Sequence, residues 1–135
     1  MSFTLERGCS DVIVTAFENI ARLIMWATSN EIDGTIEDYG IAIGDNGLIQ
    51  ISRGRDTINF QPVNSGTTQD LKGADIRSGG FSAFAVGNNG TIVRSTNRGV
   101  NWSVIPTGST ANLNAVRFGF GGNHFAVGDN GTILK

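Results

Sequence analysis

The sequence contains one cysteine, one histidine and two prolines among 135 residues. Cys9 has no second cysteine with which to pair, so a disulfide within the chain is excluded. The single histidine, His124, excludes a metal site built from several histidines, and we expect neither a metal nor another cofactor. Scarce proline beside nineteen glycines is typical of many tight turns between short strands.

A strong net charge and a long apolar run are also missing. The formal net charge of −2 gives no general attraction to nucleic acid or to an anionic membrane. Glu6 and Arg7 stand where the apolar core of a signal peptide would begin, so we expect no signal peptide. The apolar stretch 12–27 is too short and too often interrupted to span a bilayer. The sequence therefore predicts neither nucleic-acid binding nor membrane insertion, and it leaves the localisation open.

What the sequence does have is an internal repeat. Residues 41–49, 84–92 and 125–133 read IAIGDNGLI, FAVGNNGTI and FAVGDNGTI. Each unit consists of two strand-forming stretches joined by an Asn-Gly pair, whose residues tolerate the positive φ of a two-residue hairpin turn. The glycines at the fourth position of the three units are 43 and 41 residues apart. A period of this length is typical of repeat architectures.

Alignment outward from the turn defines four antiparallel strands in a repeat. The strand before the repeated unit is predicted at residues 11–17, 70–76 and 112–118, and the strand after it at residues 59–63 and 101–105. Four strands in about 42 residues match one blade of a β-propeller. The sequence therefore predicts an all-β protein, a β-propeller with about three four-stranded blades per chain.

The repeat boundaries divide the chain into blades. We expect blade 1 at residues 11–69, blade 2 at residues 70–111 and an incomplete blade 3, without its fourth strand, at residues 112–135. Residues 1–10 resemble the strand that blade 3 lacks. They are therefore expected to complete a blade of another subunit.

Three blades are too few to close a ring, because closed propellers start at about four. We expect two chains to form a six-bladed ring, although three chains with nine blades remain an alternative. At the junction, Phe3 would take the place of Trp102, and Leu5 would lie on the same side of the strand. A monomeric half-propeller is the other alternative, and it would leave two sheet edges open.

Blade 1 carries an insertion at residues 18–38. Apolar residues from Ile20 onward follow the i, i+3, i+4, i+7 spacing of an amphipathic helix, but residues 23–29 are equally compatible with a β-arm. In either form the insertion is expected to protrude from one face of the ring. Three large apolar residues would then form either a candidate partner-binding patch or a local cap over the ring's own core: Ile24, Met25 and Trp26.

An acidic loop within the insertion extends this candidate surface. It contains Glu31 and Asp33 and leads to Tyr39, the only tyrosine. The spacing of its carboxylates differs from that of an EF-hand. A carboxylate pair for glycoside hydrolysis is conceivable here, but a solvated loop is the favoured interpretation.

Residues 95–102, STNRGVNW, resemble the Asp-box or BNR repeat, S-x-D-x-G-x-x-W, of sialidase-like propellers. The repeated VG[DN]NGTI is similar to the propellers of photosystem II assembly and stability factors. The resemblance implies a structural turn in which Ser95 and Asn97 bond the local backbone and Gly99 adopts an unusual conformation. Trp102 would pack between blades. Asn97 replaces the usual aspartate.

A sialidase-like active site would bring three arginines together with a tyrosine nucleophile and a glutamate. Arg53, Arg94 and Arg98 lie at predicted turns, and no glutamate follows Glu37. We therefore expect no enzyme.

The prediction is a structural or interaction module that assembles with itself and binds a protein partner in a larger assembly, such as a virion or tail. A carbohydrate-binding lectin is the main alternative, with Trp26, Tyr39 and Trp102 as stacking surfaces. An assembly factor similar to the photosystem II family is a further alternative.

Overall fold

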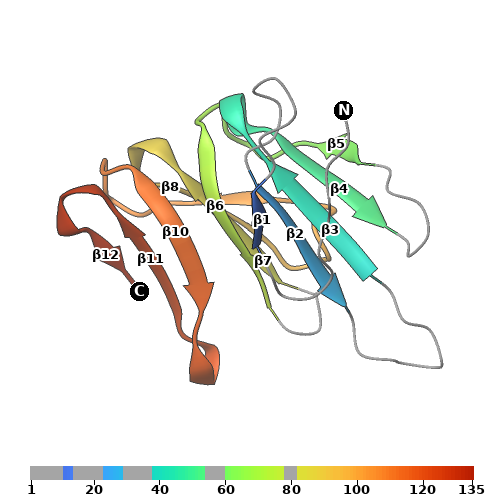
Figure 1. The fold of residues 1–135 in the computed structure, drawn as a ribbon. Helices are drawn as coiled ribbons and strands as arrows, with labels where there is room; N and C mark the ends of the chain where they lie inside the picture. Colours follow the sequence, from blue (N-terminus) through green and yellow to red (C-terminus); the bar gives the residue numbers. More distant parts are fainter. Residues whose placement is uncertain (1–10, 14–22, 29–37, 54–59, 78–81) are drawn as a thin grey trace.

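In the computed structural model the chain forms three antiparallel β-sheets stacked face to face (Figure 1). The structure describes residues 11–13, 23–28, 38–53, 60–77 and 82–135. Strands dominate these residues, and no α-helix occurs among them, so the prediction of an all-β protein is confirmed. The predicted strand at residues 1–10 lies outside the described residues.

Each sheet is a meander in which successive strands pair with one another. The first sheet contains β1 (Asp11–Ile13), β2 (Leu23–Thr28), β3 (Asp38–Ile43), β4 (Ile49–Arg53) and β5 (Gln61–Val63). The second contains β6 (Leu71–Ile76), β7 (Ala83–Gly87), β8 (Thr91–Ser95) and β9 (Ser103–Ile105). The third contains, within the described residues, β10 (Leu113–Phe118), β11 (His124–Gly128) and β12 (Ile133–Leu134).

The same turn follows β3, β7 and β11. Its asparagines, Asn46, Asn89 and Asn130, have φ angles of 55°, 54° and 57°, and the glycine that follows each also has a positive φ. The predicted left-handed Asn-Gly pair is therefore confirmed. The turn has three residues rather than two, because the residue before each asparagine also belongs to it, as at Asp45–Gly47. Three-residue loops with left-handed residues are a common hairpin connection.

The second sheet is buried on both of its faces. Successive side chains of a strand point to opposite faces, and β7 follows this rule. Ala83 and Ala85 belong to a core shared with the first sheet, whereas Phe84 and Val86 belong to a core shared with the third sheet. The middle sheet therefore holds the stack together through two separate apolar layers.

The first sheet differs from the prediction in its strand order. β2, rather than residues 11–17, is the direct neighbour of β3, and β1 lies beyond it at the edge. Ile24 pairs with Ala42 in the register in which Ala74 of β6 pairs with Ala85 of β7. β2 is thus an integral strand of the sheet, and the expectation that the insertion protrudes was wrong for this segment.

Hydrogen bonding gives the physical reason for this correction. The backbone groups of β3 need partners on both sides, and β2 supplies them along its whole length, from Leu23 to Thr28. A helix at these positions would leave that side of β3 unpaired. Of the two forms that the sequence left open, the strand is therefore the one present.

Neighbouring sheets meet closely at the repeated turns. The carboxylate of Asp70, at the start of the second sheet, accepts a hydrogen bond of 2.9 Å from the backbone N–H of Asn46. Asn112 Oδ1, at the start of the third sheet, accepts an equivalent bond of 3.1 Å from the N–H of Asn89. A side chain on Gly90 would overlap the carbonyl oxygen of Ser109, so this approach requires glycine.

Candidate interaction site on the third sheet

The outer face of the third sheet is apolar and exposed. Phe125 and Val127 of β11 are 40% and 42% exposed, and Ile133 of β12 is 70% exposed. In the repeat, Phe125 and Val127 correspond to Phe84 and Val86, which are buried between the second and third sheets. Positions of the repeat that are buried in the second sheet are therefore exposed in the third sheet.

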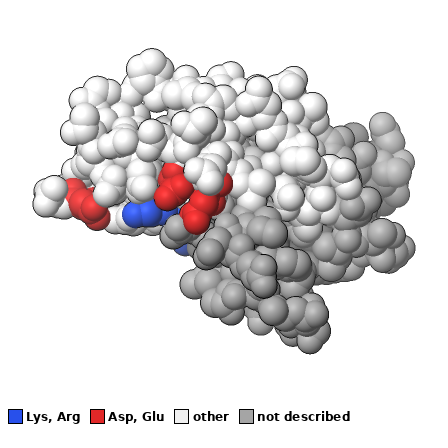
Figure 2. All heavy atoms as spheres, turned by 90° about the horizontal axis from the view of Figure 1, so that it is seen from above, with Lys and Arg blue, Asp and Glu red and all other residues white. Residues whose placement is uncertain are grey.

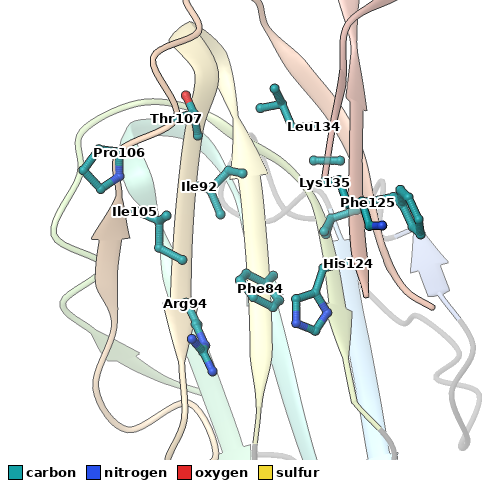
Figure 3. A pocket seen from close by; sticks show the side chains of 12 residues that line it. Phe84, Ile92, Arg94, Ile105, Pro106, Thr107, His124, Phe125, Leu134 and Lys135 are labelled. Carbon is teal, nitrogen blue, oxygen red and sulfur yellow. The ribbon is translucent and has the colours of Figure 1, made fainter. Parts of the chain in front are cut away.

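A cleft of about 370 Å³ opens between the second and third sheets, and we call it the sheet 2–3 cleft. Figure 3 shows the side chains that line it, with those of β7, β8 and β9 facing those of β11 and β12. The residues used below are Phe84, Ile92, Arg94, Ile105, Ala126, His124, Leu134 and Lys135.

An aromatic cluster lies on one side of this cleft. The His124 ring is 4.9 Å from the rings of both Phe84 and Phe118, which are themselves 5.3 Å apart. His124 Nδ1 is buried and has no hydrogen-bond partner among the described residues. The Arg94 guanidinium lies 5.7 Å from the centre of the Phe84 ring, within the range of a cation–π contact.

The cleft combines apolar walls with two cationic side chains, Arg94 and Lys135. Apolar lining with a few polar groups is the usual composition of a binding site. Elsewhere, at the end of the stack that carries the repeated turns, charged side chains are sparse on the described surface, with one acidic group at the edge and the others beside a basic group near the middle (Figure 2). On the described part of this end, uncharged side chains therefore predominate over charged ones.

The Ser95–Trp102 segment is a tightly bonded turn. Ser95 Oγ accepts a hydrogen bond of 2.9 Å from the Gly99 N–H, and Asn97 Oδ1 accepts one of 2.9 Å from the Asn101 N–H. Gly99 has a φ of 78°. Trp102 Nε1 donates to the Gly99 carbonyl at 2.8 Å, and the indole belongs to the core between the first and second sheets. In this structure these residues position an internal aromatic side chain.

The predicted partner patch is not brought to this site. Three of its residues, Ile24, Met25 and Trp26, pair with Ala42, Ile41 and Gly40 within the first sheet. Tyr39 lies in β3 opposite Ala27. Glu31 and Asp33 lie outside the described residues, as do Phe3 and Leu5. Whether any of them contacts a partner stays a prediction.

Sequence reasoning missed the outer face of the third sheet and the sheet 2–3 cleft. The signal for the outer face lay in the repeat itself, since Phe125 and Val127 have the same place in it as Phe84 and Val86. Arg94 comes from β8 in the second sheet, whereas His124 and Lys135 come from the third sheet, so no local pattern marks the cleft.

Comparison with known proteins adds no assignment, because no family model matches the chain and no curated protein or solved structure is similar to it. The described part of the chain contains no helix that is both long and apolar enough to cross a membrane.

The turn of the third sheet contains a carboxylate with a perturbed pKa. Asn114 Nδ2 donates to Asp129 Oδ1 at 2.9 Å, and Asn112 Nδ2 donates to Asp129 Oδ2 at 3.3 Å. These two bonds, the first contributing more, lower the pKa of the exposed Asp129 carboxyl from its ordinary value. Hydrogen bonds to the charged form favour ionisation.

This lowered pKa predicts a loss of stability in acid. The contribution of Asp129 is present above the ordinary pKa that the carboxyl has in the unfolded chain, and it is lost as the pH falls through the lower pKa of the folded state. We expect Asp129→Asn to reduce the difference between the free energies of unfolding at neutral and acidic pH. Urea denaturation of both chains across this range measures it. An identical pH dependence of the two chains would contradict the role of Asp129.

Proposed function

We propose that the protein is a non-enzymatic β-propeller module that assembles with copies of itself into a ring. The ring would serve as a structural or interaction component of a larger assembly, of which a virion or tail is one kind. The observation that carries the proposal is the exposed apolar face formed by Phe125, Val127 and Ile133. The stack of successive meanders with one repeated turn supports the blade interpretation.

Another β-sheet of the same kind is the structure that would cover the exposed face. In the second sheet, the equivalent face is covered by β10 and β11 of the third sheet. In the first sheet, the equivalent face is covered by β6 and β7 of the second sheet. Covering one large apolar side chain stabilises a contact by about 1.5–3 kcal/mol. A further sheet of the same kind would therefore bind here with substantial free energy.

The first sheet of a second copy is the occupant that we propose. In its β2, Ile24 and Trp26 have the register positions that Ala74 and Ile76 have in β6. In the second sheet those positions contribute to the core against the preceding sheet. Two chains joined by two such contacts would make a six-bladed ring with closed two-fold symmetry.

A charge placed on the exposed face tests this proposal. We expect Val127→Asp to weaken self-association at least about a hundredfold, because an unpaired carboxylate would be buried at the contact. Light scattering over a range of micromolar concentrations measures the mass. Val100→Asp is the matched control, since Val100 is 43% exposed, against 42% for Val127, and lies in the Ser95–Trp102 turn. An unsubstituted chain that stays monomeric would overturn the proposal.

Carbohydrate binding is a second candidate because the sheet 2–3 cleft lies between two sheets. Trp102, one of the stacking residues expected from the sequence, does not line it. Phe84, His124 and Phe125 are the aromatic residues that a sugar would meet there. A glycan array probed with the unsubstituted chain and with an Arg94→Ala chain tests this role. An array without hits would remove it.

A further inference from the structure

The sheet 2–3 cleft has a filled counterpart elsewhere in the molecule. Between the first and second sheets, Trp102 occupies a core with apolar residues of β3, β4 and β5. Three residues on one wall of the cleft correspond in the repeat to three members of that core: Phe84 to Ile41, Ile92 to Ile49 and Ile105 to Val63. This wall of the cleft therefore repeats the wall against which Trp102 packs.

The opposite wall repeats as well. Ala126 and Leu134 of the third sheet correspond to Ala85 and Val93 of the second, and both of the latter share the core with Trp102. The two walls of the cleft therefore correspond, residue by residue, to the two walls that enclose the indole of Trp102. The volume of the cleft, about 370 Å³, lies at the small end of the range for ligand sites, roughly 300–1,000 Å³. A single large side chain suits such a space.

We infer that the sheet 2–3 cleft receives the phenyl ring of Phe3 from a second copy of this chain. The ring would be carried on a strand, residues 2–6, that pairs with β12. This inference rests on the proposed self-assembly and names the segment that completes the contact. In the repeat, residues 2–6 (SFTLE) align with residues 101–105 (NWSVI), which places Phe3 on Trp102.

The register of the second sheet specifies how this strand would pair. β9 pairs with β8 through Ser103 opposite Arg94 and Val104 opposite Val93. The same register sets Thr4 opposite Lys135 and Leu5 opposite Leu134. Phe3 and Leu5 then point to the same face as Leu134, which lines the cleft, because alternate residues of a strand share a face.

The chemistry of the segment fits this position. A phenyl ring has no N–H group, so it needs no acceptor of the kind that the Gly99 carbonyl provides to Trp102. Glu6 would lie diagonally across from Lys135, within reach of an opposite-charge contact. β12, the edge strand of the third sheet among the described residues, would gain a hydrogen-bonding partner.

Cross-linking tests the pairing directly in the full-length chain. Thr4→Cys and Lys135→Cys are combined in a Cys9→Ser background and oxidised mildly. We expect a disulfide-linked dimer on a non-reducing gel, with the two positions joined in the mass spectrum. Thr4→Cys with Arg77→Cys is the control, because Arg77 is exposed beyond the end of β6, and it should give no such link. A Thr4–Lys135 link within one chain would overturn the assignment to a second copy.

Substitution of Phe3 tests the side chain itself. We expect Phe3→Ser to weaken self-association at least about tenfold, since the buried ring is lost. Phe3→Leu should weaken association less than Phe3→Ser, because leucine keeps a large apolar side chain that needs no acceptor. Phe120→Ser makes the same change at a residue that is 100% exposed and should have no effect.

The outcomes separate this inference from the proposed function. If Val127→Asp dissociates the assembly while Phe3→Ser leaves it intact and no cross-link forms, the inference is overturned and the self-assembly stands. A monomeric unsubstituted chain would overturn both. Loss of association in Phe3→Ser together with the cross-link supports both.

Discussion

A chain with Trp102 replaced by alanine should be less stable to unfolding than the unsubstituted chain by about 3–5 kcal/mol. The indole is only 8% exposed and is part of the core between the first and second sheets. It touches Gly99, whose own neighbours include Ile51 and Ile41 of the first sheet. Truncation would remove apolar contacts from both sheets and leave a cavity between them.

The loss would extend beyond packing. Trp102 Nε1 donates to the Gly99 carbonyl, so the alanine variant leaves that buried carbonyl without this donor. Urea denaturation followed by circular dichroism measures the free energy of unfolding. Val104→Ala, at a 48% exposed residue of the neighbouring strand β9, is the control and should change it by less than about 0.5 kcal/mol. Equal effects of the two substitutions would contradict a core role for Trp102.

Local chemistry explains why much of the fold was predictable. The left-handed turn depends only on a few consecutive residues, because Asn and Gly tolerate a positive φ. Each sheet has one such turn, with its asparagine at Asn46, Asn89 or Asn130. The strands on both sides of these turns follow from the same short pattern. The second and third sheets therefore form at the places that the repeat indicated.

The first sheet shows where local patterns are insufficient. Residues 11–17 and 23–28 are both apolar enough to pair with β3, and the choice depends on which segment aligns its backbone with β3 after folding. β2 takes this position with six paired residues. The apolar residues from Ile20 onward have the spacing of an amphipathic helix, but pairing with β3 in the folded chain overrides this local preference.

Whether a residue of the candidate site is exposed depends on the neighbouring sheet rather than on the local sequence. The sequence FAV occurs at residues 84–86 and again at residues 125–127. Phe84 is 6% exposed and Phe125 is 40% exposed, so the same three residues in equivalent strands are buried where a further sheet covers them and exposed where none does among the described residues. No property of a single segment distinguishes the two. The Ser95–Trp102 turn was predictable because its bonds lie within the motif itself.

The last prediction compares one substitution at two turns. Gly90 and Gly131 hold the same position in the repeat, with φ angles of 64° and 71°. A side chain on Gly90 would overlap the Ser109 carbonyl, whereas no atom lies within 4 Å of that position at Gly131. Alanine in the left-handed region costs about 1–2 kcal/mol at either site. Overlap with the backbone of the next sheet should add about 1–3 kcal/mol at Gly90 alone.

We therefore expect Gly90→Ala to lower the free energy of unfolding by about 2–5 kcal/mol and Gly131→Ala by about 1–2 kcal/mol. Denaturation in the Val127→Asp background measures both in the monomer. Equal losses there would contradict the close approach of the third sheet to Gly90. In the unsubstituted background, Gly131 would meet the next sheet of a second copy as Gly90 meets Ser109. Gly131→Ala should then weaken self-association, and unchanged association would contradict a repeat-like contact at this turn.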